Sequence, residues 1–224
     1  MRIELPCIAV DWGTTHMRAM LCDSETSGPV EKIEGNGISS LRKSPADELL
    51  HAIKPWTRKH GKVDLLLGGM VGADIGWRST PYLECPLELR ELARELVTFR
   101  ENDHRVAIVP GVGCTNSLGQ PDFMRGEEIQ VLGWIKRSDG PANAVLCLPG
   151  THTKWVRVRD GRLEGFTTSL TGELYALLND YSVLVQSAVR KSSAYDVAEF
   201  MKGVDVAAEH GSQLLHTLFS ARSR

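Results

Sequence analysis

Short apolar runs separated by turn residues dominate the first half of the chain. Runs at 8–11, 17–22 and 30–34 predict three consecutive antiparallel strands. Beyond them the apolar spacing alternates between strand and helix periods, which predicts helices at 44–55, 86–98 and 125–136 and buried strands at 63–67 and 105–109. Three paired strands followed by alternating helices and strands are typical of a ribonuclease-H-like α/β domain.

The second half begins as a copy of the first, because 145–155 repeats the glycine–hydroxyl pattern of 8–18. Strands are expected at 144–148, 154–159 and 162–167, and helices at 172–179, 182–190, 195–201 and 212–220. We therefore predict two ribonuclease-H-like (actin-like) domains with a cleft between them, 1–138 and an incomplete 139–224, with the turn-rich segment at 138–141 as the boundary. The expected strand at 144–148 would leave an uncovered sheet edge, which invites homo-oligomer formation.

Charge and composition narrow the class of protein. Lys and Arg number 26 against 28 Asp and Glu, and this net charge of -2 excludes a broadly basic nucleic-acid binder and argues against a polybasic membrane-surface protein. No apolar run approaches the ~20 residues needed to cross a bilayer, and the first residues do not resemble a signal peptide. Five dispersed cysteines without a Cys-x-x-Cys motif fit reduced thiols, so a cytoplasmic protein is expected.

Two glycine–hydroxyl turns carry the first candidate chemistry. The turns at 13–15 and 150–153 each follow a strand and expose backbone N–H groups that can surround a phosphate. Two such turns on facing domains would hold a polyphosphate from both sides, and Asp11 beside the first turn would serve Mg²⁺. The alternative is a pair of ordinary hairpin turns, with Lys154 as a surface residue and His16 and His152 as turn residues.

Two further segments hold candidate substrate and proton-transfer groups. The glycine-rich loop 68–78 follows a buried strand, and its aromatic and cationic residues suit a sugar acid, although packing of an aromatic residue onto the domain would explain them too. At the expected start of the helix at 125–136, Asp122 or Glu127 could accept a hydroxyl proton and Arg125 could pair with a carboxylate. Helix-dipole stabilisation is the structural alternative for these acids, and Glu128 stays open as the base.

Six motifs in order resemble the 2-dehydro-3-deoxygalactonokinase family of the sugar kinase, Hsp70 and actin superfamily; they lie at 11–15, 69–72, 124–128, 148–155, 171–178 and 218–222. The resemblance spans essentially the whole chain. It implies a kinase that uses ATP and Mg²⁺ to phosphorylate the 6-hydroxyl of 2-dehydro-3-deoxy-D-galactonate in galactonate catabolism. Family members continue beyond Arg224, so the alternative is a truncated, catalytically impaired protein that still binds the sugar acid. A phosphohydrolase that uses the same turns is a third possibility.

The resemblance also implies a role for Asp11 at the metal. Glu127, or else Asp122, is the expected base, a choice that the resemblance does not settle. The phosphates of ATP would be held by Gly13, Thr14, Thr15, Gly150, Thr151, His152, Thr153 and Lys154. The sugar acid would lie near Gly69, Met70, Val71, Gly72, Trp77, Arg78, Tyr82 and Arg125. ATP and the small sugar acid are the only partners expected, with no nucleic acid and no membrane.

Overall fold

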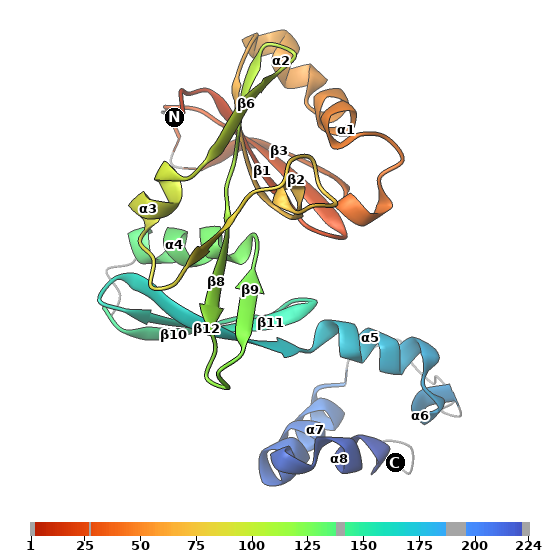
Figure 1. Ribbon diagram of the computed structural model, residues 1–224. Coiled ribbons are helices and arrows are strands. Elements are labelled where there is room, and N and C mark those ends of the chain that lie inside the picture. The colour runs from red at the N-terminus through yellow and green to blue at the C-terminus, as the bar shows by residue number, and fades with distance from the viewer. Residues whose placement is uncertain (1–2, 27, 138–141, 187–195, 221–224) are drawn as a thin grey trace. The chain divides into compact units, whose positions relative to one another are not determined.

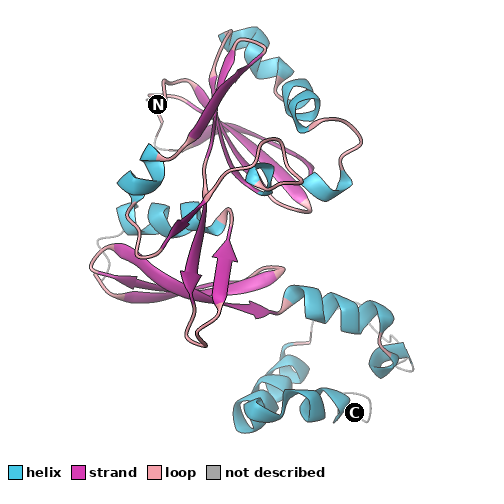
Figure 2. Ribbon diagram, viewed as in Figure 1, coloured by secondary structure: helices cyan, strands magenta, loops and turns pink. Residues whose placement is uncertain are grey.

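The computed structural model describes residues 3–26, 28–137, 142–186 and 196–220. Contacts divide the chain into two compact units. The first comprises Met1–Leu148 and Lys154–Ser169, and the second comprises Pro149–Thr153 and Leu170–Arg224. Figure 1 shows the elements of each unit, and Figure 2 shows that the strands gather in the first unit while the second is mostly helical.

A six-stranded sheet in the order β3-β2-β1-β4-β7-β6 is the centre of the first unit. Its strands are β1 (Cys7–Trp12), β2 (His16–Cys22), β3 (Pro29–Asn36), β4 (Asp64–Gly69), β6 (Val97–Glu101) and β7 (His104–Ile108). Strands β1, β2 and β3 pair antiparallel, whereas β4 pairs parallel with both β1 and β7. This arrangement confirms the predicted α/β class and the meander extended by parallel strands.

Helices α1 (Pro45–Ala52) and α2 (Lys54–His60) cover one face of this sheet (Figure 1). Ser44 caps α1 by accepting a 3.1 Å hydrogen bond from the Asp47 N–H, as its position before a proline suggests. A break at Ile53 separates α1 from α2, in line with the expected effect of Pro55. Leu49 and Trp56 are buried against the sheet in one continuous apolar core.

Two three-stranded sheets complete the strand structure. One contains β5 (Tyr82–Glu84), β8 (Gly111–Thr115) and β9 (Pro121–Met124); the other contains β10 (Ala144–Leu148), β11 (His152–Arg159) and β12 (Arg162–Leu170). The β10–β12 meander confirms the predicted repeat, and β10 is the edge strand of its sheet. The buried face of helix α4 (Glu127–Arg137) packs in a second apolar core, together with residues of β8, β9, β11 and β12.

The structure corrects two sequence predictions. The helix expected at 86–98 is only the short α3 (Leu89–Arg94), because the chain turns into β6 at Val97. Asp122, expected at the start of a helix, lies in β9, because the helix begins five residues later at Glu127.

The second unit carries four α-helices among the described residues: α5 (Gly172–Tyr181), α6 (Val183–Gln186), α7 (Val197–His210) and α8 (Leu214–Ser220). The helices expected at 172–179 and 212–220 are confirmed, and the third, expected at 195–201, extends to His210. Residues 187–190 of the helix expected at 182–190, and the boundary segment 138–141, fall outside the described residues. The division into domains at 138/139 stays a prediction. Within the described chain, no helix combines the length and apolarity needed to span a membrane.

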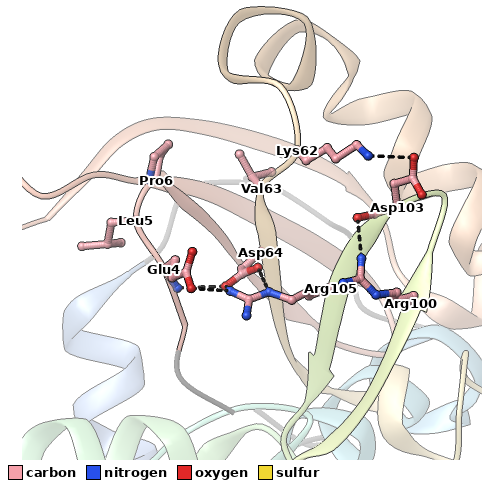
Figure 3. A pocket seen from close by; sticks show the side chains of 9 residues that line it. All are labelled: Glu4, Leu5, Pro6, Lys62, Val63, Asp64, Arg100, Asp103 and Arg105. Carbon is pink, nitrogen blue, oxygen red and sulfur yellow. Dashed lines mark hydrogen bonds and ion pairs between the residues drawn. The ribbon is translucent and has the colours of Figure 1, made fainter.

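A charged cluster secures the amino ends of the central strands, at the opposite end of the sheet from the β1–β2 turn (Figure 3). Arg105 donates to both carboxylate oxygens of buried Asp64, at 2.7 and 2.5 Å, and the Glu4 N–H donates a third bond at 2.8 Å. Burial alone would raise the pKa of Asp64, but these bonds outweigh it and hold the pKa below its usual value. The cluster therefore ties the segment before β1 to β4 and β7.

We expect this cluster to make stability depend on pH in the acidic range. Because the folded-state pKa of Asp64 lies below the unfolded value of about 3.9, its contribution is full above that value and is lost as pH falls through the folded pKa. Asp64→Asn should lower the free energy of unfolding by about 2 kcal/mol at pH 7. It should also reduce the loss of stability that the parent shows as pH falls. Urea denaturation between pH 3 and 7 measures both effects. Lys62→Met, which removes the exposed pair with Asp103, is the control and should change far less; equal losses would contradict the assignment.

Candidate active site

The turn between β1 and β2 is held through its carbonyl groups. The Gly13 N–H closes the hairpin on the His16 carbonyl at 2.9 Å. Backbone N–H groups of 37–39 then donate to the carbonyls of Gly13, Thr14 and Thr15 at 3.1 Å each. The turn is thus held in place by hydrogen bonds to its carbonyl oxygen atoms.

The nitrogen atoms of the same turn remain available. The backbone N–H groups of Thr14 and Thr15 make no hydrogen bond with any residue that the structure describes, and both residues are exposed. Neighbouring unpaired N–H groups beside hydroxyl side chains form an anion-binding surface. The geometry therefore favours a phosphate-binding turn over the alternative of an ordinary hairpin turn.

Asp11 lies at the carboxyl end of β1, directly opposite Arg18 of β2. The Arg18 guanidinium donates to the Asp11 carboxylate at 3.3 Å, and both side chains are partly exposed. Arg18 was missed in the sequence, although its register opposite Asp11 follows from the hairpin length. A cation beside a carboxylate at this edge can neutralise phosphate charge.

Three backbone segments meet at Gly69, which ends β4 with a φ of +93°. A side chain at Gly69 would come within 2.6 Å of the Trp12 carbonyl at the end of β1. A side chain at Gly126, where φ is +114°, would come within 3.3 Å of the Gly69 Cα. Only glycines allow the end of β1, the end of β4 and the start of α4 to approach this closely.

Two consecutive glutamates begin α4 and bind the turn that precedes it. Glu127 Oε2 accepts from the Arg125 N–H at 3.2 Å, and Glu128 Oε2 accepts from the Gly126 N–H at 2.7 Å. Glu127 is partly exposed, whereas Glu128 is completely buried. Burial raises the pKa of Glu128 to about 8, although backbone N–H groups favour its charged form.

A cavity of about 230 Å³ connects these features, because Asp11, Gly68 and Gly126 all line it. Its remaining walls are apolar side chains from β1, β2, β4 and α4, together with the polar Gln130 of α4. The structure therefore brings Asp11 of the first turn to the same cavity as the start of α4. This convergence at the carboxyl end of parallel strands is where open α/β sheets bind ligands.

Asp122 is committed to a structural network. Its carboxylate accepts from the Thr168 N–H at 2.8 Å, from the Thr168 hydroxyl at 2.5 Å and from the Asn116 amide at 3.4 Å. Burial opposes ionisation, but these bonds and the charge of Lys154 lower the pKa of Asp122 below its usual value. A carboxylate held in this way is a poor proton acceptor.

Lys154 belongs to the same network. It is only 5% exposed, and its ammonium group donates to the Phe123 carbonyl at 2.7 Å and to the Thr168 hydroxyl at 2.8 Å. The surface-lysine alternative is therefore wrong. A phosphate contact would require Lys154 to give up these bonds.

The residues expected near the sugar acid fall into two groups. Trp77 packs edge-on against Phe99 at 5.4 Å, and the Arg78 guanidinium lies 4.1 Å from the same ring, so packing accounts for both. The Arg125 guanidinium instead lies 4.3 Å from the Tyr82 ring. The Tyr82 ring contacts the Phe123 ring in a tilted arrangement, with the centroids 4.9 Å apart, and both rings are half-exposed. The aromatic pair at β5 and β9 is the more accessible of the two surfaces.

Arg125 also fixes the glycine-rich loop. Its guanidinium donates to the Thr80 hydroxyl and to the Thr80 carbonyl, the latter at 3.0 Å. A side chain at Gly72 would meet both the Thr80 hydroxyl and the guanidinium, so this glycine lets the loop fold over Arg125. The buried Nε of Arg125 has no hydrogen-bond partner among the described residues.

The second glycine–hydroxyl turn lies in the other unit, at the N-terminus of α5. The Glu173 N–H donates to the Thr151 carbonyl at 3.0 Å, and the Glu173 carboxylate contacts His152 Nε2 at 2.5 Å. Thr153 shares a 2.7 Å hydroxyl–hydroxyl bond with Thr171. The turn is thus joined to the start of a ten-residue helix, whose dipole favours a bound anion.

Comparison with known proteins places the chain in a family. The 2-keto-3-deoxy-galactonokinase family matches residues 11–224. The chain belongs to this family. A protein from Rhizobium meliloti (strain 1021), named as a 2-dehydro-3-deoxygalactonokinase, is 31% identical over 216 residues, which cover 96% of this chain and 70% of that protein. The 2-dehydro-3-deoxygalactonokinase of Escherichia coli (strain K12) is 34% identical over 178 residues, or 79% of this chain and 58% of that protein.

A solved structure from Sinorhizobium meliloti that carries the same enzyme name has a related fold. It superimposes with a TM-score of 0.83 at 29% identity, and the match covers 97% of this chain and 71% of that one. The family resemblance found in the sequence is therefore confirmed, together with the fold class.

The contact at Gly69 gives a direct mutational test. Gly69→Ala should lower the free energy of unfolding by about 2 kcal/mol or more, because alanine is strained at this φ and would meet the Trp12 carbonyl. Gly133→Ala is the matched control: it lies within α4, its added methyl would meet no atom within 4 Å, and it should stabilise the protein by about 1 kcal/mol. Thermal and urea denaturation compare the two. If Gly69→Ala were as stable as Gly133→Ala, the close approach would not constrain the site.

Proposed function

We propose that this chain carries the activity of its family: ATP-dependent phosphorylation of the 6-hydroxyl of 2-dehydro-3-deoxy-D-galactonate. The observation that carries the proposal is the shared cavity, where Asp11 at the end of β1 meets the start of α4 beside a turn with unpaired N–H groups. Phosphoryl transfer depends mainly on positioning and charge neutralisation, which these groups supply. Since ATP is the donor, we expect the reaction to take place in the cytoplasm.

The residues at the first turn suit the phosphates of ATP. The N–H groups of Thr14 and Thr15 would bind phosphate oxygens, and Arg18 would neutralise part of their charge. Among the described residues no three acidic, His or Cys side chains gather as a metal site. Mg²⁺ is commonly held by one or two carboxylates together with phosphates and water, so Asp11 alone is compatible with it.

Glu127 is our choice for the base that accepts the proton of the substrate hydroxyl. It is partly exposed, whereas Glu128 is buried and Asp122 is fully bonded within its network. Its single backbone hydrogen bond from Arg125 orients the carboxylate. A positioned carboxylate typically contributes about 10²–10⁴-fold to the rate of such a step.

The remaining predicted residues take supporting roles in this proposal. Gly150, Thr151, His152 and Thr153 would form the second phosphate-binding turn, oriented by α5. Tyr82 and Arg125 would contact the sugar acid, with the loop at 69–72 held in place by Thr80. The edge strand β10 exposes Val145 on an unpaired side of its sheet, so we also propose self-association through this edge.

An enzyme-coupled assay of ADP release, with and without 2-dehydro-3-deoxygalactonate, tests the activity. We expect ADP release that depends on the sugar acid. Release without the sugar acid would indicate a hydrolase. Silence combined with thermal stabilisation by the sugar acid would indicate a binding protein, and either outcome would overturn the kinase proposal.

Two substitutions test the assigned residues in the same assay. Asp11→Asn should lower kcat by at least about 100-fold, because the carboxylate that would hold Mg²⁺ at the phosphates is lost. Glu127→Gln should lower kcat by roughly 10²–10⁴-fold while the KM values change little. Glu95→Gln, an exposed acid at the end of α3, is the control and should behave like the parent. Activity retained in Asp11→Asn would remove Asp11 from the mechanism.

A further inference from the structure

The proposed mechanism leaves one buried acid without a role. Glu128 is 0% exposed, and its Oε1 has no hydrogen-bond partner among the described residues. Its other oxygen accepts the Gly126 N–H at 2.7 Å. A charged carboxylate with an unpaired buried oxygen would be costly, so this environment favours the neutral acid.

The surroundings of Glu128 offer little compensation for a negative charge. Glu127 precedes it and repels a second charge, while Arg125 partly offsets that repulsion. From β4 the turn is faced by Gly68 and Gly69, which bring no side chain. Burial raises the pKa of Glu128 to about 8, so the group is mostly protonated at neutral pH.

Glu128 also holds the most constrained point of the turn. Gly126 adopts a φ of +114° and approaches Gly69 closely. Its N–H is bound by Glu128, and the preceding N–H, of Arg125, is bound by Glu127. The two carboxyl groups therefore accept hydrogen bonds from consecutive backbone N–H groups. A shift of the backbone at Gly126 would also rotate the Glu127 carboxylate.

We propose that Glu128 is a positioning residue that acts as a neutral carboxylic acid: it fixes Gly126 and so directs the Glu127 carboxylate into the site. The inference rests on the proposed function of Glu127 as base. Loss of the Glu128 proton places a second charge beside Glu127 and weakens this arrangement. Activity then falls as pH rises through the Glu128 titration.

The first test needs no activity. The folded pKa of Glu128 lies above the unfolded value of about 4.3, so its contribution to stability is full below that value and is lost as pH rises towards 8. Glu128→Gln mimics the neutral acid and cannot titrate. We expect the stability of Glu128→Gln relative to the parent to increase steadily between pH 4.5 and 8 in urea denaturation. Glu95→Gln, an exposed acid at the end of α3, is the control and should keep the pH dependence of the parent. A constant difference between Glu128→Gln and the parent would overturn the proposal.

The second test is the pH profile of kcat. The parent should lose activity near pH 8, whereas Glu128→Gln should show no such loss and should recover most of the activity that Glu128→Ala lacks. We expect Glu128→Ala to fall by about 100-fold, the cost of misplacing a catalytic group by about 1 Å. If Glu128→Ala does not fold, Glu128→Asp, which is too short to reach Gly126, replaces it. An alkaline loss that persists in Glu128→Gln would refute the role of Glu128.

Failure of this inference can be separated from failure of the kinase proposal. A parent protein without sugar-acid-dependent turnover would refute the kinase proposal and the positioning role, while the denaturation series would still determine the protonation of Glu128. An active parent with an unchanged profile in Glu128→Gln would refute only the inference.

Discussion

The close approach of three backbone segments at Gly69 is the constraint on which the site depends. The end of β1, the end of β4 and the turn before α4 meet there without side chains between them. Because β1 also carries Asp11 and leads into the Thr14–Thr15 turn, any displacement at Gly69 would move the phosphate and proton-transfer groups apart. The glycines therefore have a geometric function, and the polar residues depend on it.

Three acids within seven residues acquire different properties from their surroundings. Asp122 receives four hydrogen bonds and has a lowered pKa. Glu128 is buried with one unpaired oxygen and has a raised pKa. Glu127 is partly exposed and accepts one hydrogen bond from a backbone N–H group. Neighbouring residues of similar chemistry are thus separated into structural, positioning and candidate catalytic groups by burial and bonding alone.

Sequence patterns predicted the elements whose signals are local. The meander of β1–β3 and the repeated strands at 144–167 both follow from periodicity and turn residues within a short window. The small sheet of β5, β8 and β9 could not be found in this way, because its strands are only three to five residues long and are defined by long-range pairing. The early end of α3 has the same cause, since β6 owes its existence to pairing with β7.

The sequence predicted which residues belong to the candidate site, but not how these residues are buried and hydrogen-bonded. Asp11 and the glycine–hydroxyl turns stand out by spacing, and the acids at the expected helix start include Glu127 and Asp122 as alternative bases. The sequence could not show that Lys154 is buried, because its partners Phe123 and Thr168 lie 31 and 14 residues away. The choice between Glu127 and Asp122 likewise needed burial and bonding, which only the folded chain defines.

The central claim is that the N–H groups of Thr14 and Thr15 bind the phosphates of ATP. Amide chemical shifts of these two residues, followed by NMR during titration with ATP and Mg²⁺, test it most directly. We predict large, saturable shifts of both amides, with little change at Gly133 on α4. Saturable binding of ATP that leaves the Thr14 and Thr15 amides unshifted would contradict the account.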